Sequence, residues 1–323
     1  MSIKTLEVLA KENQMQPIMH MNINTWKSII SFTELKKYPL LPCPYCLETA
    51  LKIDDSSIQK RPIAEKVLEQ SSRKFKTEKA AKKAVYDRKI ESLSNGEGFW
   101  LKMFASLGLA YQDMIDPLNG EQYQFNCFFS CNRCGESTNA TGILLKPLKL
   151  SEQSKVKPSI IKVEHFSPTI PMIPLSNHIP GNIKAELIDA FKHFHFDTLS
   201  SASKLRRAIE QFCINMEAKG RDLNQRICNL KQRYPEEAEY LEALKLIGNE
   251  GTHSHDVTEI DLLHAFEIVQ FVLEVYDRKA RYQATQANYE LLANKFGKDK
   301  SGKDKMQLRL EKSNNNKEVE SVE

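Results

Sequence analysis

The sequence has no run of about 18 apolar residues, the length that a transmembrane helix needs, so we expect no membrane-spanning segment and no membrane partner. Its first residues, MSIKTLEVLAKENQ, carry charges within their apolar part, which argues against a secretory signal peptide. A large excess of positive or negative charge is also lacking, because 46 Lys and Arg against 42 Asp and Glu leave a net charge of only +4. This is too small to diagnose nucleic-acid binding by itself. We expect a cytoplasmic protein.

Cysteine is sparse and odd in number, with seven residues in 323. In a chain without an export signal this does not indicate a disulfide framework. Four of the cysteines instead form two C-x-x-C pairs, Cys43 with Cys46 and Cys131 with Cys134. Two residues between thiolates let both sulfurs reach one ion about 2.3 Å away. Four thiolates leave no coordination position for a substrate or water, so we predict a structural zinc ion.

The segments beside both pairs suit short strands, and we interpret residues 1–150 as a zinc-ribbon module. Gly135 supplies the backbone freedom that the second turn needs directly after its last ligand. The interval between the two pairs is far longer than a ribbon needs, and we predict a helical insertion at about 57–115. Two unrelated thiol pairs are the alternative. Cys127 is the one rival ligand, although we expect it on the strand before the second turn, and Cys213 and Cys228 are expected to be inert core thiols.

Basic residues are concentrated in this insertion, with eleven of them against four acidic residues between Lys60 and Lys89. A basic stripe on a helix can follow a phosphate backbone, so DNA or RNA is a candidate partner. Phe75 and Tyr86 are the only aromatic side chains among them, which leaves bases little to stack on. A solvated helical hairpin kept soluble by its charge is the alternative. The candidate nucleic-acid-binding residues are Arg73, Lys74, Lys76, Lys79, Lys82 and Lys83.

Residues 151–175 hold prolines among extended residues, which is typical of an interdomain linker. From 176 to 294 apolar residues recur at three-and-four spacing, which predicts a helical bundle. Thr258-x-x-Asp261 resembles a capping box at the start of its last helix. Residues 295–323 have almost no core-forming residues, and we expect a disordered tail. The predicted fold class is α+β, mostly α.

The segment IPLSNHIPGNIKAELIDAFKHFHFDTLSSASKLRRAIEQFC, followed by LKLIGNEGTHSH and a long amphipathic helix, resembles a bacterial family of helical domains of unknown function. Members of that family are often joined to restriction-type nucleases, helicases or zinc ribbons. The family is thought to be related to the HEPN helical domains, many of which are RNases in defence and toxin systems. The resemblance covers about Pro171 to Lys279. It implies a HEPN-like bundle in a restriction or phage-defence setting, with a nuclease or helicase as partner.

An active HEPN RNase carries an arginine, a polar residue, three further residues and then a histidine. Asn249 and His253 match the polar residue and the histidine, whereas Gly248 stands at the arginine position. Lys245 lies one turn earlier, but a lysine cannot hold a phosphate bidentately as arginine does. This departure puts the implied catalytic set of His253, Asn249 and Lys245 in doubt. We interpret IGNEGTHSH, residues 247–255, as the turn into the last helix.

The LRRAIE motif supplies a second group of polar residues. Arg206 and Glu210 are four residues apart on one helical face and can pair, with Arg207 beside them. If the bundle brings this helix against Asn249 and His253, the residues form a candidate phosphate-binding patch. The alternative is an internal hydrogen-bonded network that fixes the turn. His193 and His195 have no partner at clear ligand spacing, so a second metal is not expected.

These features favour a non-catalytic, nucleic-acid-associated adaptor that combines a structural zinc ribbon with a HEPN-like bundle in a prokaryotic defence or restriction system. One alternative is a metal-independent endoribonuclease that uses His253, with Lys245 or Arg207 in place of the usual arginine. Another is a protein-interaction subunit that forms a homodimer through the helical bundle and its long last helix.

Overall fold

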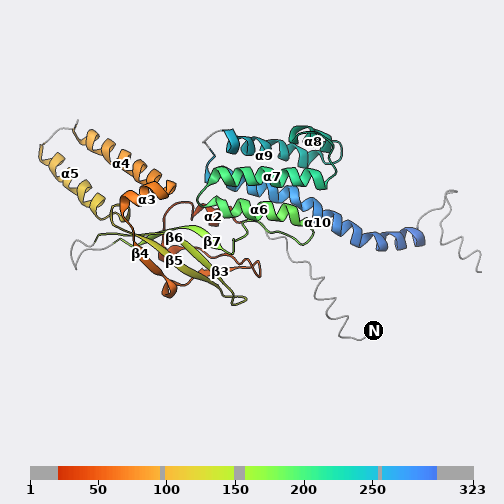
Figure 1. The fold of residues 1–323 in the computed structure, drawn as a ribbon, viewed down its shortest axis with the longest axis horizontal. Helices are drawn as coiled ribbons and strands as arrows, with labels where there is room; N and C mark the ends of the chain where they lie inside the picture. Colours follow the sequence, from red (N-terminus) through yellow and green to blue (C-terminus); the bar gives the residue numbers. More distant parts are fainter. Residues whose placement is uncertain (1–20, 95–98, 149–156, 254–256, 297–323) are drawn as a thin grey trace, which may run out of the picture. The chain divides into compact units, whose positions relative to one another are not determined.

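The computed structural model describes residues 21–94, 99–148, 157–253 and 257–296 (Figure 1). Side chains at 93–94, 99–101 and 249–253 lie outside this description. The chain divides into two compact units, a larger one of residues 1–175 and 180–272 and a smaller one of residues 176–179 and 273–323. Within the described ranges, no helix is long and apolar enough to cross a membrane. Most of the predicted tail at 295–323 falls outside these ranges.

The larger unit contains an antiparallel sheet that forms a half-barrel. Its strands follow the order β1-β7-β6-β5-β3-β2, and β4 also pairs with β5. Every pairing is antiparallel. The strands are β1 (Thr33–Glu34), β2 (Leu41–Pro42), β3 (Thr49–Ile53), β4 (Gln59–Pro62), β5 (Glu121–Cys131), β6 (Ser137–Lys146) and β7 (Ile160–Ser167).

One face of the sheet packs into a core because its strands alternate at period two. In β5, Phe125, Cys127 and Phe129 are buried, whereas Phe128 between them is half exposed. The Phe129 ring meets the Phe166 ring edge to face, with the centroids 5.4 Å apart. The helix α2 (Ile23–Lys27) contributes Trp26, which is 1% exposed.

The other face is covered in part by helices that the chain inserts between β4 and β5. These are α3 (Glu65–Ser71), α4 (Arg73–Ser94) and α5 (Phe99–Met114), and α4 and α5 lie side by side as a hairpin (Figure 1). Leu68 and Phe75 from α3 and α4 pack on Ile143 and Leu145 of β6. The helices occupy residues 65–114 of the predicted insertion at 57–115, and its first residues form η2 (Asp55–Ser57) and β4 instead.

The predicted linker at 151–175 is wrong for residues 160–167, which form β7. This strand pairs with β6 over most of its length and with β1 at its start. Ile161, Val163 and Phe166 are buried, so the segment belongs to the core of the sheet. Prolines border the strand, and their extended bias is as compatible with a strand as with a linker.

The C-terminal region is helical, as predicted. It comprises α6 (Gly181–Phe194), α7 (Thr198–Asn215), α8 (Leu223–Leu230), α9 (Pro235–His253) and α10 (Glu259–Phe296). Helix α7 lies between α6 and α9 (Figure 1). Buried Phe191 of α6 meets buried Phe266 of α10 edge to face, with ring centroids 5.0 Å apart. Thr258 donates its backbone N–H to the Asp261 carboxylate at 2.9 Å and accepts the Asp261 N–H, which confirms the capping box.

The interpretation of residues 247–255 as a turn is wrong up to His253, because α9 continues through that residue. The two glycines of the segment indicated a break, but an isolated glycine is tolerated inside a helix at a cost of roughly 1 kcal/mol. Residues 254–256 lie outside the described ranges. The change of helix therefore comes after the IGNEGTH segment and not within it.

Candidate functional site

Four thiols converge where the β2–β3 and β5–β6 turns meet. The Sγ atoms of Cys43 and Cys134 are 3.7 Å apart, as are those of Cys46 and Cys131. All four sulfurs lie within 4.8 Å of one another. A tetrahedron of thiolates about 2.3 Å from a zinc ion has edges of about 3.8 Å, whereas a disulfide would bring two sulfurs to about 2.0 Å. The geometry fits a four-thiolate metal site, and all four cysteines are free thiols.

The two turns are built alike. Each first cysteine accepts a backbone hydrogen bond through its carbonyl, Cys43 from Leu47 at 2.9 Å and Cys131 from Gly135 at 3.0 Å. Both donors adopt a left-handed backbone, with φ of 64° at Leu47 and 78° at Gly135. Gly135 confirms the predicted need for backbone freedom after the second ligand. Leu47 fills the equivalent position at a conformational cost, because its Cβ disfavours this region.

The peptide groups of the second turn favour a thiolate at Cys131. Burial raises the pKa of this thiol, but the backbone N–H groups of Cys134 and Arg133 lower it to about 7. The Arg133 N–H points at the Cys131 sulfur from 3.4 Å. A thiolate is the form that binds a metal, so the turn prepares its own ligand. Arg133 itself is exposed beside the site.

The remaining cysteines are not part of the cluster. Cys127 is buried in β5 as predicted, and burial raises the pKa of its thiol to about 12. Cys213 is also a buried core thiol with a pKa raised by burial to about 12. Cys228 is exposed, so its prediction as a core thiol is wrong. Within the described residues, only the four cysteines of the two C-x-x-C pairs bring metal-ligating atoms together.

Two lysines of the predicted basic stripe on α4, Lys79 and Lys82, pair with acidic side chains of neighbouring elements. Lys79 pairs with Glu65 of α3, and Lys82 pairs with Asp116 at 2.7 Å. These contacts direct both ammonium groups toward the neighbouring elements of the insertion, and each side chain is only about a quarter exposed, at 23% and 27%. Their charge is therefore largely compensated within the fold.

Lys76 and Lys83 are exposed and make no ion pair within the described part of the chain. Arg73 is exposed at the start of α4, where its carbonyl accepts a hydrogen bond from Thr77 Oγ1 at 2.9 Å. Because Lys79 and Lys82 are compensated by carboxylates, the positive charge that α4 presents to solvent is smaller than the sequence count indicates.

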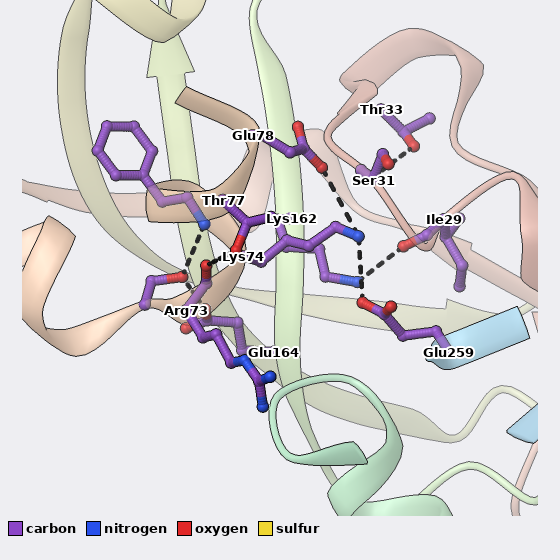
Figure 2. A network of polar contacts seen from close by, with 12 residues as sticks. Ile29, Ser31, Thr33, Arg73, Lys74, Thr77, Glu78, Lys162, Glu164 and Glu259 are labelled. Carbon is purple, nitrogen blue, oxygen red and sulfur yellow. Dashed lines mark hydrogen bonds and ion pairs between the residues drawn. The ribbon is translucent and has the colours of Figure 1, made fainter. Parts of the chain in front are cut away.

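Lys74, the remaining residue of that stripe, belongs to a buried network that the sequence did not indicate (Figure 2). Its Nζ lies 3.1 Å from Glu259 of α10 and 3.9 Å from Glu78 of α4. Lys162 of β7 lies beside these groups, 1% exposed, and donates a hydrogen bond to the carbonyl of Ile29 at 2.9 Å. Burial, followed by the charge of Lys74, lowers the pKa of Lys162 to about 8. Burial raises the pKa of Glu78.

This network joins four segments that are distant in sequence: the loop after α2, α4, β7 and the start of α10. Ser72 adds a further link through a 2.7 Å hydrogen bond from its Oγ to Glu164 of β7. Buried charges are stabilised only where partners surround them, so the network fixes how these elements pack. Through these contacts the network holds α4 of the insertion against β7 of the sheet.

The LRRAIE residues pair within the bundle. Arg206 Nε lies 3.3 Å from Glu210, as the four-residue spacing predicts. Arg207 pairs with Glu186 of α6 at 2.6 Å. Lys245 of α9 donates to Asn224 of α8 at 2.7 Å. The Arg207 and Lys245 contacts link neighbouring helices, whereas the Arg206–Glu210 pair lies within α7.

Helix α7 does pack against α9 at the expected place. A Cβ built on Gly248 would lie 2.7 Å from the Cβ of Arg206, so the two helices touch there through backbone and side-chain stem. Glycine at this position is therefore explained by close packing. Asn249 and His253 belong to α9, but their side chains lie outside the described part. The arrangement of the predicted catalytic set is therefore not described.

The site and the fold thus define an α+β protein with a cluster of four cysteines beside its sheet that fits a metal ion, followed by a helical C-terminal region. A family model described as a domain of unknown function (DUF4145) matches residues 189–291, roughly a third of the chain. The matched segment runs from the end of α6 into α10. No curated protein and no solved structure matches the chain significantly.

Proposed function

We propose that this protein is a non-catalytic, nucleic-acid-associated adaptor whose fold depends on a structural zinc ion. The observation that carries the proposal is the closed cluster of four thiols, with sulfur separations of 3.7 Å. A complete thiolate shell supplies no open coordination position, and it is the donor set that structural zinc sites use. The metal therefore stabilises the fold around the two turns and takes no part in a reaction.

The nucleic-acid part of the proposal is supported by exposed basic residues on the same unit. Lys76 and Lys83 of α4 remain exposed, as do Lys60 and Arg61 of β4. Phosphate contacts of this kind give affinity without sequence preference and weaken as salt is added. Binding of a labelled oligonucleotide by the zinc-loaded protein at low salt tests the proposal, and absence of binding would end it.

The helical domain supports the role of an adaptor. Arg206, Arg207 and Lys245 pair with groups of the bundle itself, which is what the structural interpretation of these residues expects. The resemblance to families found beside restriction and defence enzymes suggests a nuclease or helicase as partner. Genes adjacent to this one that encode neither a nuclease, a helicase nor a methyltransferase would argue against that setting.

An RNA-cleavage assay distinguishes the endoribonuclease alternative from the adaptor proposal. The adaptor proposal expects no cleavage of RNA by purified protein in EDTA. Cleavage by the wild type that His253→Ala abolishes would overturn the non-catalytic proposal. The variant Cys228→Ala, at an exposed thiol distant in sequence from His253, is the matched control for handling and contamination.

A second candidate function, dimerisation through the last helix, is favoured by one observation in the smaller unit. The distal part of α10 carries exposed apolar residues at successive spacings of seven, three and four: Tyr282, Tyr289, Leu292 and Phe296. This spacing is that of a coiled-coil seam, and most helical stability in proteins comes from packing of the apolar face and not from helix propensity. A second copy of the chain supplies a matching stripe by symmetry.

Light scattering of the full-length protein tests this second function. We expect a dimer for the wild type and a monomer for Leu292→Lys, which places a charge in the seam. Ala287→Lys adds the same charge on the opposite side of the helix and should leave the dimer intact. A monomeric wild type at high concentration would contradict dimerisation.

A further inference from the structure

Two lysines from different strands converge on one tyrosine ring at the end of the sheet nearest the insertion. Lys60 Nζ lies 4.7 Å from the centroid of the Tyr123 ring, and Lys146 Nζ lies 5.7 Å from the same centroid. Lys60 is exposed, whereas Tyr123 and Lys146 are half-buried. An aromatic face attracts an ammonium group, so the ring holds both cations near one point.

Strand register explains why these residues meet. In the β4–β5 ladder Pro62 is opposite Tyr123 and Lys60 is opposite Phe125, so Lys60 is a diagonal neighbour of Tyr123. In the β5–β6 ladder Leu144 is opposite Tyr123, which makes Lys146 the diagonal neighbour on the other side. Diagonal pairs of this kind are within reach of long side chains. The convergence is thus built into the sheet.

The two amines are close enough to disturb each other. Contact with the Lys146 amine lowers the pKa of Lys60, and burial lowers it further, whereas the charge of Glu121 acts in the opposite direction. The Glu121 carboxylate accepts the hydroxyl hydrogen of Tyr123 at 2.6 Å. One carboxylate therefore faces two ammonium groups, and a positive charge is left over at this point of the surface.

The arrangement differs from that of the lysines on α4. Lys79 and Lys82 each lie against a carboxylate of a neighbouring element, which compensates their charge. Neither Lys60 nor Lys146 makes an ion pair within the ranges that the structure describes. Like charges held together and only partly compensated are destabilising, and an anion between them removes the repulsion.

We propose that Lys60 and Lys146 bind one phosphate group, with the Tyr123 ring fixing the direction of both side chains. A phosphate fits because its several oxygens accept hydrogen bonds from two ammonium groups at once. The two ammonium groups already lie against the Tyr123 ring, so the site contacts phosphate and not a stacked base. We infer that this phosphate belongs to the backbone of a nucleic acid, and in this respect the inference rests on the proposed function.

Fluorescence anisotropy with a labelled single-stranded oligonucleotide tests the site on the full-length, zinc-loaded protein. The double variant K60Q/K146Q is compared with K76Q/K83Q, which removes the same charge from the exposed face of α4. We expect at least a fivefold loss of affinity for K60Q/K146Q beyond that for K76Q/K83Q. Its salt dependence should also decrease by about one phosphate contact. K60R/K146R should retain binding, since the charge stays in place.

Titration of inorganic phosphate, followed by NMR of the lysine ε-methylene signals, separates the possible sources. If the wild type binds no oligonucleotide while phosphate shifts the Lys60 and Lys146 signals, the site stands and the proposed function fails. If the wild type and K60Q/K146Q bind the oligonucleotide equally, the site is not used by nucleic acid and the inference is overturned. Absence of both oligonucleotide binding and phosphate shifts overturns the inference together with the proposed function.

Discussion

Lys162 Nζ donates a 2.9 Å hydrogen bond to the carbonyl oxygen of Ile29, and through it β7 holds the loop that follows α2. The same ammonium group lies among Lys74, Glu78 and Glu259, which come from the insertion and from the start of α10 (Figure 2). A lysine that is 1% exposed is costly to charge, and its neighbours offset that cost only in part. Its titration is therefore a probe of how these elements pack.

The first prediction concerns stability at alkaline pH. The pKa of Lys162 is about 8 in the folded chain against an ordinary value of 10.5. Between these values the unfolded chain holds a proton that the folded chain has lost, so this group makes the folded state more stable as pH rises from about 8 to 10.5. The gain is at most about 3 kcal/mol. Chemical denaturation at several pH values measures it.

Lys162→Met is the comparison for this measurement, because Met has a similar length and no charge. The variant should lack the stability gain between pH 8 and 10.5, because it carries no group that titrates at this position. Other groups titrate in this range in both proteins, so the difference between the two pH profiles is the quantity of interest. Parallel profiles would show that Lys162 does not carry a lowered pKa.

The second prediction concerns the two cysteine turns. Gly135→Ala should lower the free energy of unfolding by about 1 kcal/mol, because alanine disfavours the left-handed backbone while its Cβ meets nothing within 4 Å. Leu47→Gly should cost less than an ordinary removal of a leucine side chain, because it relieves the same strain in the first turn. Equal stability of Gly135→Ala and wild type would contradict the turn geometry.

The third prediction concerns metal removal. Cys43→Ser or Cys131→Ser should abolish stoichiometric zinc and unfold the sheet, since structural zinc contributes on the order of 10 kcal/mol of folding free energy. A chelator should do the same to the wild type. Cys228→Ser, which changes an exposed thiol outside the cluster, is the control and should keep full zinc content. Elemental analysis with circular dichroism gives both readouts, and a folded, zinc-free wild type would rule out a structural metal.

The fourth prediction concerns the contact between α7 and α9. Gly248→Ala should destabilise the chain by roughly 1–3 kcal/mol, because the new Cβ would lie 2.7 Å from the Cβ of Arg206. Arg206→Gly removes that obstacle, so the double variant should be more stable than the sum of the two single changes predicts. Strict additivity of the two changes would show that the helices do not touch there.

Local motifs were the part of this protein that its sequence predicted well. The C-x-x-C spacing predicted the four-thiol cluster, because each pair of ligands is formed within a single turn. The capping residues Thr258 and Asp261 predicted the start of α10. Three-and-four spacing predicted the helical C-terminal region. Residues 160–167 were missed as a strand because their pairing partner, β6, decides their conformation.

Contacts between distant segments were not accessible in the same way. The lysines of α4 formed a basic stripe in the sequence, but Asp116 and Glu259, which compensate Lys82 and Lys74, come from other elements. Gly248 indicated a turn, although its reason is the side chain of Arg206 on a neighbouring helix. Lys60 and Lys146 are 86 positions apart and meet only through the register of three strands.

The most direct test of the central claim is the salt dependence of oligonucleotide binding by the zinc-loaded protein. An adaptor that contacts phosphates should show measurable affinity at about 50 mM salt, with the logarithm of the association constant falling linearly with the logarithm of salt concentration. The slope should correspond to several phosphate contacts for both DNA and RNA strands. No binding at the lowest salt concentration, or an affinity that salt leaves unchanged, would contradict the account.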